Sequence, residues 1–357
     1  MLTSFQRLLN DSSQNVKRQI INIYIFLITA NIVIWVLALF AFHDYPLLLG
    51  TSVLAYTFGL RHAVDADHIA AIDNVTRKLM QENKRPVAVG FFFSLGHSTI
   101  VVALSIAIAL TASAIQNNFL ELKEIGGLIG TSVSATFLLV IALINSLVLW
   151  DIFQTFQSVK RGGIYNEQSL DEFLNQRGLL GRFFRPLFRL IDSSWKMYPL
   201  GVLFGLGFDT ATEVGLLGIS ATQAAQGLPV WSILIFPALF TAGMSLIDTT
   251  DGILMLGAYG WAYVKPIRKL YYNMTITLVS VLVAVVIGGL EALNIIGDKF
   301  KLEGSFWKFI GSLNDNFGTI GYIIIGIFIL SWIISTIVYK FQKYDDIEVI
   351  TVSSDEE

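Results

Sequence analysis

Residues 60–74 read LRHAVDADHIAAIDN and place two histidines and three aspartates inside an otherwise apolar stretch: His62, Asp65, Asp67, His68 and Asp73. If this stretch spans a membrane, each ionisable group costs about 2.5–3.5 kcal/mol on insertion scales, so the group needs something that compensates it. Imidazole nitrogens and carboxylate oxygens together are ligands of first-row divalent metals. The segment therefore predicts a metal site within a membrane.

The composition indicates the fold class. The 357 residues are 54% hydrophobic and 14% charged, which is typical of an all-α polytopic membrane protein. At about 20 residues per crossing, the sequence predicts eight transmembrane helices. These predicted spans cover residues 20–42, 47–72, 87–114, 126–156, 200–225, 230–263, 272–293 and 317–341.

The distribution of Lys and Arg predicts the orientation, because cytoplasmic loops carry an excess of both. With both termini in the cytoplasm, 19 of the 24 basic residues lie inside, four lie outside and Arg61 lies within a span. The predicted parts are a cytoplasmic N-terminus (1–19), spans 1–4 (20–157), a basic cytoplasmic loop (158–197), spans 5–8 (198–341) and an acidic cytoplasmic tail (342–357).

Two short patterns recur at nearly the same distance. Residues 58–60 read FGL and recur at 204–206, while FxxGHS at 93–98 is echoed by FxxGMS at 240–245. The two offsets agree within one residue and relate spans 2–3 to spans 5–6. Because an offset of three spans reverses direction across the membrane, the pattern predicts an inverted repeat, which is common in secondary transporters.

The other unusual polar residues lie in those repeated spans. His97 is in the third span, Asp209 and Glu213 are four residues apart in the fifth, and Asp248 and Asp251 are three residues apart in the sixth. Residues three or four apart share a helix face. We interpret these five as residues of a transport pathway or as groups that support the metal ligands.

Helix geometry constrains the site in the second span. On a regular helix His62, Asp65 and His68 share an arc of about 120°, whereas Asp67 points away. Either Asp67 faces another helix, or the span is broken near Ala66 so that both faces converge. All four are candidate metal ligands, Asp65 being either a ligand or a group that fixes a histidine tautomer.

The segment RHAVDADHI resembles the signature of the nickel/cobalt transporter family, H-x4-D-H in the second transmembrane helix. The resemblance extends to LGFDTATEV, FFFSLGHST and GMSLIDTTDG, and to the eight-span layout. It implies uptake of Ni(II) and/or Co(II) across the bacterial cytoplasmic (inner) membrane. It also implies that His62, Asp67 and His68 are essential for transport, with Asp65 adjacent.

We therefore expect a multi-pass secondary transporter in the lipid bilayer rather than an enzyme. The divalent metal ion is its substrate, and we expect no prosthetic group and no nucleic-acid partner. A nucleotide-binding loop of the form G-x4-G-K-[ST] is absent, so no ATPase subunit is evident. The alternatives are an exporter of the same or another divalent metal, a ligand-sensing receptor, or an intramembrane metal-dependent hydrolase, although the protease motif H-E-x-x-H is absent.

Overall fold

The protein was analysed as a computed structural model that describes residues 15–82, 84–111, 119–162, 191–206, 211–262, 266–342 and 344. Within these residues all regular structure is helical, as the sequence predicts. The longer helices are α2 (Val16–Phe42), α3 (Pro46–His62), α4 (Ala66–Gln81), α5 (Val89–Thr111), α6 (Phe119–Lys160), α10 (Ala211–Ala225), α12 (Ile235–Ala262), α13 (Pro266–Lys299) and α15 (Phe317–Phe341). The shorter ones are η2 (Ser194–Lys196), α9 (Met197–Gly205), α11 (Val230–Ile233) and α14 (Ser305–Asn314).

Six helical segments in the described part of the chain are long and apolar enough to cross a membrane, namely α2, α5, α6, α11 with α12, α13 and α15. The pair α3 and α4 meets the same criterion when taken together, which gives up to seven. The predicted fifth span, residues 200–225, coincides with α9 and α10, and residues 207–210 between them lie outside the described residues. Most of the predicted basic loop and nearly all of the acidic tail also lie outside them.

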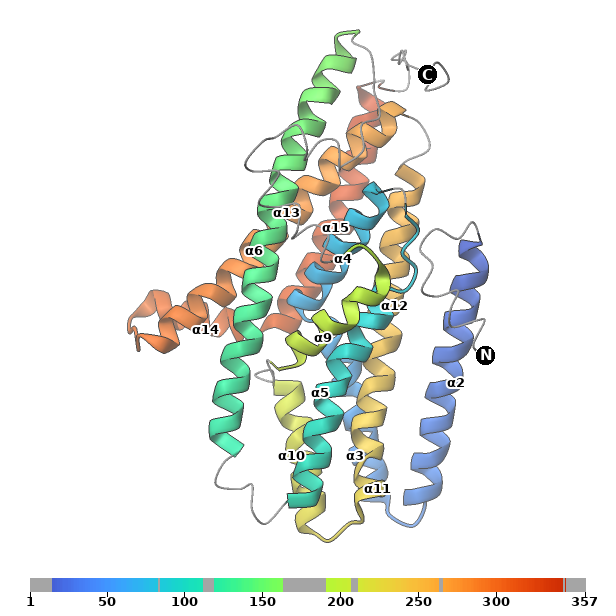
Figure 1. The fold of residues 1–357 in the computed structure, drawn as a ribbon, viewed down its shortest axis with the longest axis vertical. Helices are drawn as coiled ribbons and strands as arrows, with labels where there is room; N and C mark the ends of the chain where they lie inside the picture. The colour runs from blue at the N-terminus through green and yellow to red at the C-terminus, as the bar shows by residue number, and fades with distance from the viewer. Residues whose placement is uncertain are drawn as a thin grey trace.

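The broken helix α3–α4 occupies the middle of the bundle. It continues along the long axis of the molecule, with α3 in the lower half of Figure 1 and α4 in the upper half. Helix α12 packs against α2, α3, α4 and α5, and α4 also contacts α13 and α15. The pair α6 and α13 packs side by side at the flank of the bundle. The apolar helices therefore enclose α3 and α4, which carry the ionisable residues of segment 60–74.

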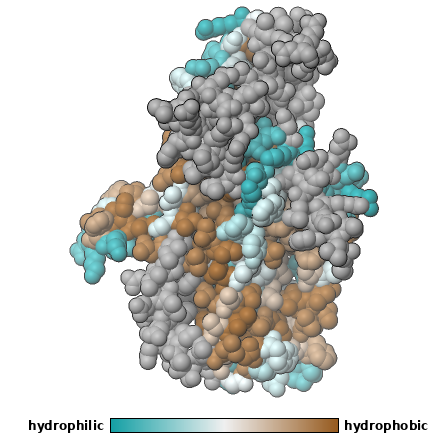
Figure 2. Space-filling model, in the orientation of Figure 1, coloured by the Kyte–Doolittle hydropathy of each residue, from teal (hydrophilic) through white to brown (hydrophobic). Residues whose placement is uncertain are grey.

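The outer helices present apolar side chains outward. Phe40 on α2 is 80% exposed and Phe341 at the end of α15 is 83% exposed. Figure 2 shows hydrophobic surface over much of the lower half of this face. A large exposed apolar surface is costly in water and suits contact with lipid tails.

The break between α3 and α4 decides between the two geometries left open by the sequence. Helix α3 ends at His62 and α4 starts at Ala66, and the two axes are bent by 50°. Asp65 immediately before α4 has extended backbone angles, φ −66° and ψ 148°. The second predicted span is therefore a broken helix, and the break lies between the two histidines.

Glycines let the helices around the break approach one another closely. A Cβ at Gly59 of α3 would overlap the backbone carbonyl of Phe240 on α12. A Cβ at Gly96 of α5 would likewise overlap the carbonyl of Tyr198 on α9. Small residues at such crossings are typical of helix packing in membranes. These contacts fix α3 and α5 against their neighbours at the level of the histidines.

Helix α14 is an element that the sequence analysis does not predict. It follows Gly304, whose positive φ of 125° suits glycine, and it projects sideways from the bundle in Figure 1. Its aromatic residues Phe306 and Phe309 are exposed.

Candidate metal site

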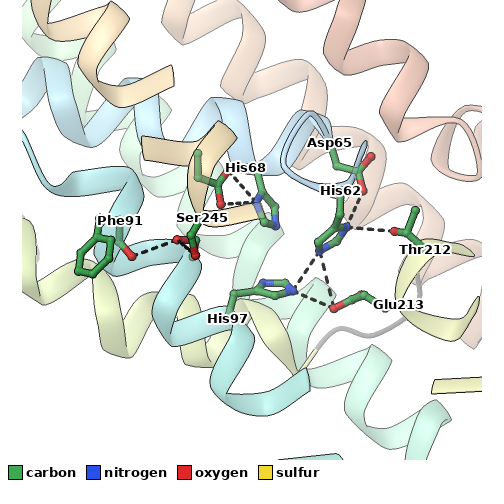
Figure 3. A network of polar contacts seen from close by, with 10 residues as sticks. His62, Asp65, His68, Phe91, His97, Thr212, Glu213 and Ser245 are labelled. Atoms are coloured by element: carbon green, nitrogen blue, oxygen red, sulfur yellow. Dashed lines mark hydrogen bonds and ion pairs between the residues drawn. The ribbon is translucent and has the colours of Figure 1, made fainter. Parts of the chain in front are cut away.

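Three of the four histidines of the chain converge at the break. His62 is the last residue of α3, His68 lies near the start of α4 and His97 lies on α5 (Figure 3). One ring nitrogen of each lies within 4.8 Å of the others, and all three residues are buried. The Nε2 atoms of His62 and His97 are 3.0 Å apart. Three imidazoles from three helices thus face a common point.

The break makes this convergence possible. On an unbroken helix, His62 and His68 would lie about 9 Å apart along the axis and about 120° apart around it. In the structure their ring centroids are 4.6 Å apart. Ending α3 at His62 and restarting at Ala66 therefore turns both rings toward the same space.

A fourth ligand group comes from α10. Glu213 Oε1 lies 2.8 Å from His97 Nε2 and 3.7 Å from His62 Nε2, and the residue is buried. Its neighbour Thr212 brings Oγ1 to 3.3 Å from His62 Nδ1. Helix α10 thus adds a carboxylate oxygen to the three ring nitrogens.

Two further carboxylates contact the opposite side of the imidazole rings. Asp65 Oδ2 lies 2.8 Å from His62 Nδ1, and both oxygens of Asp248 lie 3.3 Å from His68 Nδ1. A carboxylate at Nδ1 accepts a hydrogen bond from that nitrogen and so keeps the ring proton on Nδ1. The lone pair then lies on Nε2, as is usual for a histidine that binds a metal. The Nε2 atom of His68 is buried, and no residue that the structure describes forms a hydrogen bond with it.

The remaining predicted site residues lie in different positions. Asp67 follows the break on α4, and its Oδ1 is buried without a hydrogen-bond partner. Asp251 is on α12, three residues beyond Asp248. Asp209 lies outside the described residues. Arg61 has Asp65 as its ion-pair partner, with the two charged groups 3.8 Å apart.

The structure places His97 and Glu213 closer to His62 and His68 than the sequence predicts. His97 and Glu213 were interpreted as pathway or supporting residues, yet their ligand atoms lie among those of His62 and His68. Thr212 was not singled out at all. A signal for His97 was available, because three of only four histidines fall within apolar segments.

The donor set has a clear chemical preference. Three imidazole nitrogens and one carboxylate oxygen suit Zn, Cu, Ni, Co or Fe, whereas Mg and Ca prefer oxygen alone. The 357 residues include no cysteine, so no thiolate contributes.

These features define the class of protein. Several apolar helices surround a buried cluster of ionisable side chains at the break of a central helix. Discontinuous helices that contribute to a polar centre inside the membrane are typical of membrane transport proteins.

The family follows from the sequence. Residues 48–338 match the NicO family, described as "High-affinity nickel-transport protein". The chain therefore belongs to this family, and it is a transport protein rather than an enzyme. No solved structure matches the chain.

The chain is similar over most of its length to nickel and cobalt transport proteins. It is 57% identical over 339 residues to the high-affinity nickel transport protein of Cupriavidus necator, covering 95% of this chain and 97% of that one. It is 47% identical over 302 residues to the nickel transporter NixA of Staphylococcus aureus, covering 85% and 88%. It is 42% identical over 288 residues to the cobalt transport protein NhlF of Rhodococcus rhodochrous, covering 80% and 81%.

Proposed function

We propose that the protein takes up Ni(II) and/or Co(II) as a secondary transporter, and that the ion binds between His62, His68, His97 and Glu213. The observation that carries the proposal is the convergence of three buried imidazoles, two of which have a carboxylate at Nδ1. The names of its relatives support nickel or cobalt as the cargo. The ion is a substrate here and not a resident cofactor.

In this proposal the four residues that the sequence nominates as ligands have three roles. His62 and His68 bind the ion directly. Asp65 orients His62, since its oxygen lies against Nδ1. Asp67 supplies negative charge beside the site, because it interacts electrostatically with both histidines. Asp248 orients His68, and Asp251 and Asp209 belong to the pathway.

We further propose eight spans, with α9 and α10 together forming the fifth. The inverted repeat supports this assignment, because it relates α3 and α4 of the second predicted span to α9 and α10. It also relates the close contact of α3 with α12 to that of α9 with α5. A Cβ at Gly59 of α3 would overlap the carbonyl of Phe240, and a Cβ at Gly201 of α9 would overlap the carbonyl of Phe93, which the repeat matches to Phe240.

With eight spans, both termini lie in the cytoplasm and the protein lies in the bacterial cytoplasmic membrane. The excess of Lys and Arg in the loops on that side supports this orientation. No nucleotide-binding loop is present in the sequence, so ion gradients rather than ATP would drive transport through this chain.

The first prediction tests the site by removing one ligand. We expect His97→Ala to lower accumulation of radioactive nickel or cobalt about 10–100-fold, because the ion loses an imidazole from its first coordination sphere. Accumulation is measured in cells that express the variant, with its abundance in the membrane determined in parallel.

His43→Ala is the matched control, because His43 follows α2 at an exposed position, where its ring contacts Asp44 and the Phe40 carbonyl. We expect this variant to accumulate metal like the wild type. Normal accumulation by a correctly inserted His97→Ala variant would contradict the site. Lower metal content in wild-type cells than in cells without the protein would indicate export instead of uptake.

A further inference from the structure

A second group of buried oxygen atoms lies deeper in the bundle, away from the histidines. Asp73 on α4 is fully buried, and its Oδ1 accepts a hydrogen bond from the Tyr259 hydroxyl on α12. Its Oδ2 has no hydrogen-bond partner among the described residues. Ser280 on α13 is also fully buried, lies close enough to Asp73 to interact with it, and has a hydroxyl without a partner that meets hydrogen-bond geometry.

Asp251 connects this group to the histidine site. It is one helical turn from Asp248, which contacts His68, and it interacts electrostatically with both Asp248 and Asp73. Its Oδ2 atom is buried, and no described residue offers it a hydrogen bond. Helices α4 and α12 are close at this level, because a Cβ at Gly252 would lie 3.5 Å from Ile72. The three carboxylates therefore form a series from His68 toward the Gln81 end of α4.

The described positive charges do not balance this series. Arg77, one turn beyond Asp73, interacts electrostatically with that carboxylate, and its guanidinium donates hydrogen bonds to Thr277 and Asn74, so one fixed cation stands against three carboxylates. Neither Asp73 nor Asp251 has a basic nitrogen of the described residues within 4.0 Å. Buried carboxylates without a partner are costly, and a bound cation removes that cost.

We propose that Asp73 and Asp251, together with the hydroxyls of Tyr259 and Ser280, form a second site for the transported divalent cation. This site lies between the histidine site and the Gln81 end of α4, which faces the cytoplasm in the proposed orientation. The inference rests on the proposed function, since it places a second site along the same route. All its protein ligands are oxygen atoms, and Arg77 lies on its cytoplasmic side.

The chemistry of the two sites differs in a way that suits transfer. Imidazole nitrogens bind Ni(II) and Co(II) more strongly than carboxylate and hydroxyl oxygens do. An oxygen-only site holds these ions weakly and with more of their water. An ion that leaves the histidines would therefore reach a site from which release toward the cytoplasm is easier.

The test is titration of the purified full-length protein with Co(II), followed by calorimetry and visible absorption. We expect the wild type to bind two ions, one with the stronger absorption of nitrogen-containing coordination and one with the weak absorption of oxygen-only coordination. Asp251→Asn should keep the first ion and lose the second. It should also lower cobalt accumulation in cells about tenfold, a typical effect of removing a residue that supports metal transfer or binding.

Glu291→Gln is the matched control, because Glu291 is a buried carboxylate on α13 that accepts a hydrogen bond from Ser134 and contributes to neither site. It should bind two ions. Ser280→Ala, which retains both carboxylates, should weaken only the second ion and provides a test if Asp251→Asn does not fold. A single ion bound by the wild type, or two by a folded Asp251→Asn variant, would overturn the second site.

The same titration separates this inference from the proposed function. Loss of the nitrogen-type absorption in His97→Ala, with the oxygen-type ion retained, supports both sites. Retention of the nitrogen-type absorption in His97→Ala contradicts the histidine site. Loss of only the oxygen-type ion in Asp251→Asn supports the second site whatever the result for His97→Ala.

Discussion

Among the described residues, His68 is hydrogen-bonded on one side of its ring. Its Nδ1 lies 3.3 Å from both oxygens of Asp248, whereas its fully buried Nε2 has no hydrogen-bond partner in the described part of the chain. An unpaired ring nitrogen in an apolar environment is costly. In the site that we propose, the ion would take the place of that partner, and Asp248 would hold the ring toward it.

The prediction at this scale concerns Asp248. We expect Asp248→Asn to weaken Ni(II) binding by purified protein about 10–100-fold, because the amide no longer holds His68 in the required tautomer with a full negative charge. Calorimetric titration measures the change. Asp298→Asn, at an exposed position near the end of α13, is the control and should bind like the wild type. A change of less than about twofold for Asp248→Asn would argue against the orienting role.

The sequence predicts most of the residues of the candidate metal site, but only part of the role that each one has there. The sequence nominates His62, His68 and Asp65 through their spacing, and it nominates His97 through its presence in an apolar segment. Whether His97 lies beside His62 depends on how α5 packs against α3 and α9. Spacing along one helix carries no information about contacts between helices.

At the scale of elements, the break between α3 and α4 and the glycine contacts around it work together. The break directs His62 and His68 to one point, and Gly59 holds α3 against the backbone of α12. The sequence left the break as one of two possibilities, because the turn residues Ala63 and Val64 carry no glycine or proline signal. Whether the helix breaks there depends on contacts with neighbouring helices, which the local sequence does not describe.

Two glycines of α3 provide a matched prediction at this scale. A Cβ at Gly59 would overlap the Phe240 carbonyl, whereas a Cβ at Gly50 would meet no atom within 4 Å. We expect Gly59→Ala to destabilise the protein by about 1–3 kcal/mol, since an added methyl group in a packed contact forces the backbone to shift. Gly50→Ala should be neutral or slightly stabilising, because alanine favours helix.

Thermal unfolding in detergent and nickel accumulation in cells measure both substitutions. Equal stability and equal accumulation for the two variants would mean that the α3–α12 contact at Gly59 is not needed to assemble the site.

At the scale of the whole molecule, the number of spans determines which side of the membrane each loop faces. Eight spans put Asp44 and Asp298 on one side and Arg161 on the other, and all three are exposed. If α9 and α10 did not cross, Asp298 would lie on the side opposite to Asp44.

The absence of cysteine makes this prediction directly testable. We expect Asp44→Cys and Asp298→Cys to react with a membrane-impermeant maleimide in intact cells, and Arg161→Cys to react only after the membrane is permeabilised. The unmodified chain has no thiol and should remain unlabelled throughout. Labelling of Asp44→Cys without Asp298→Cys in intact cells would contradict the eight-span assignment.

The sequence by itself determined that the chain is an all-helical membrane protein, which residues are chemically unusual, and to which family it belongs. The first two follow from composition and from short-range spacing, which are properties of the chain alone, and the family follows from the match of its motifs and of residues 48–338 to known transport proteins. Only the tertiary structure decided that the second span is broken, that His97 and Glu213 join His62 and His68, and that Asp65 and Asp248 lie behind the rings. These depend on helices far apart in the sequence packing together, and that packing is fixed by close backbone contacts and not by the pattern within any one helix.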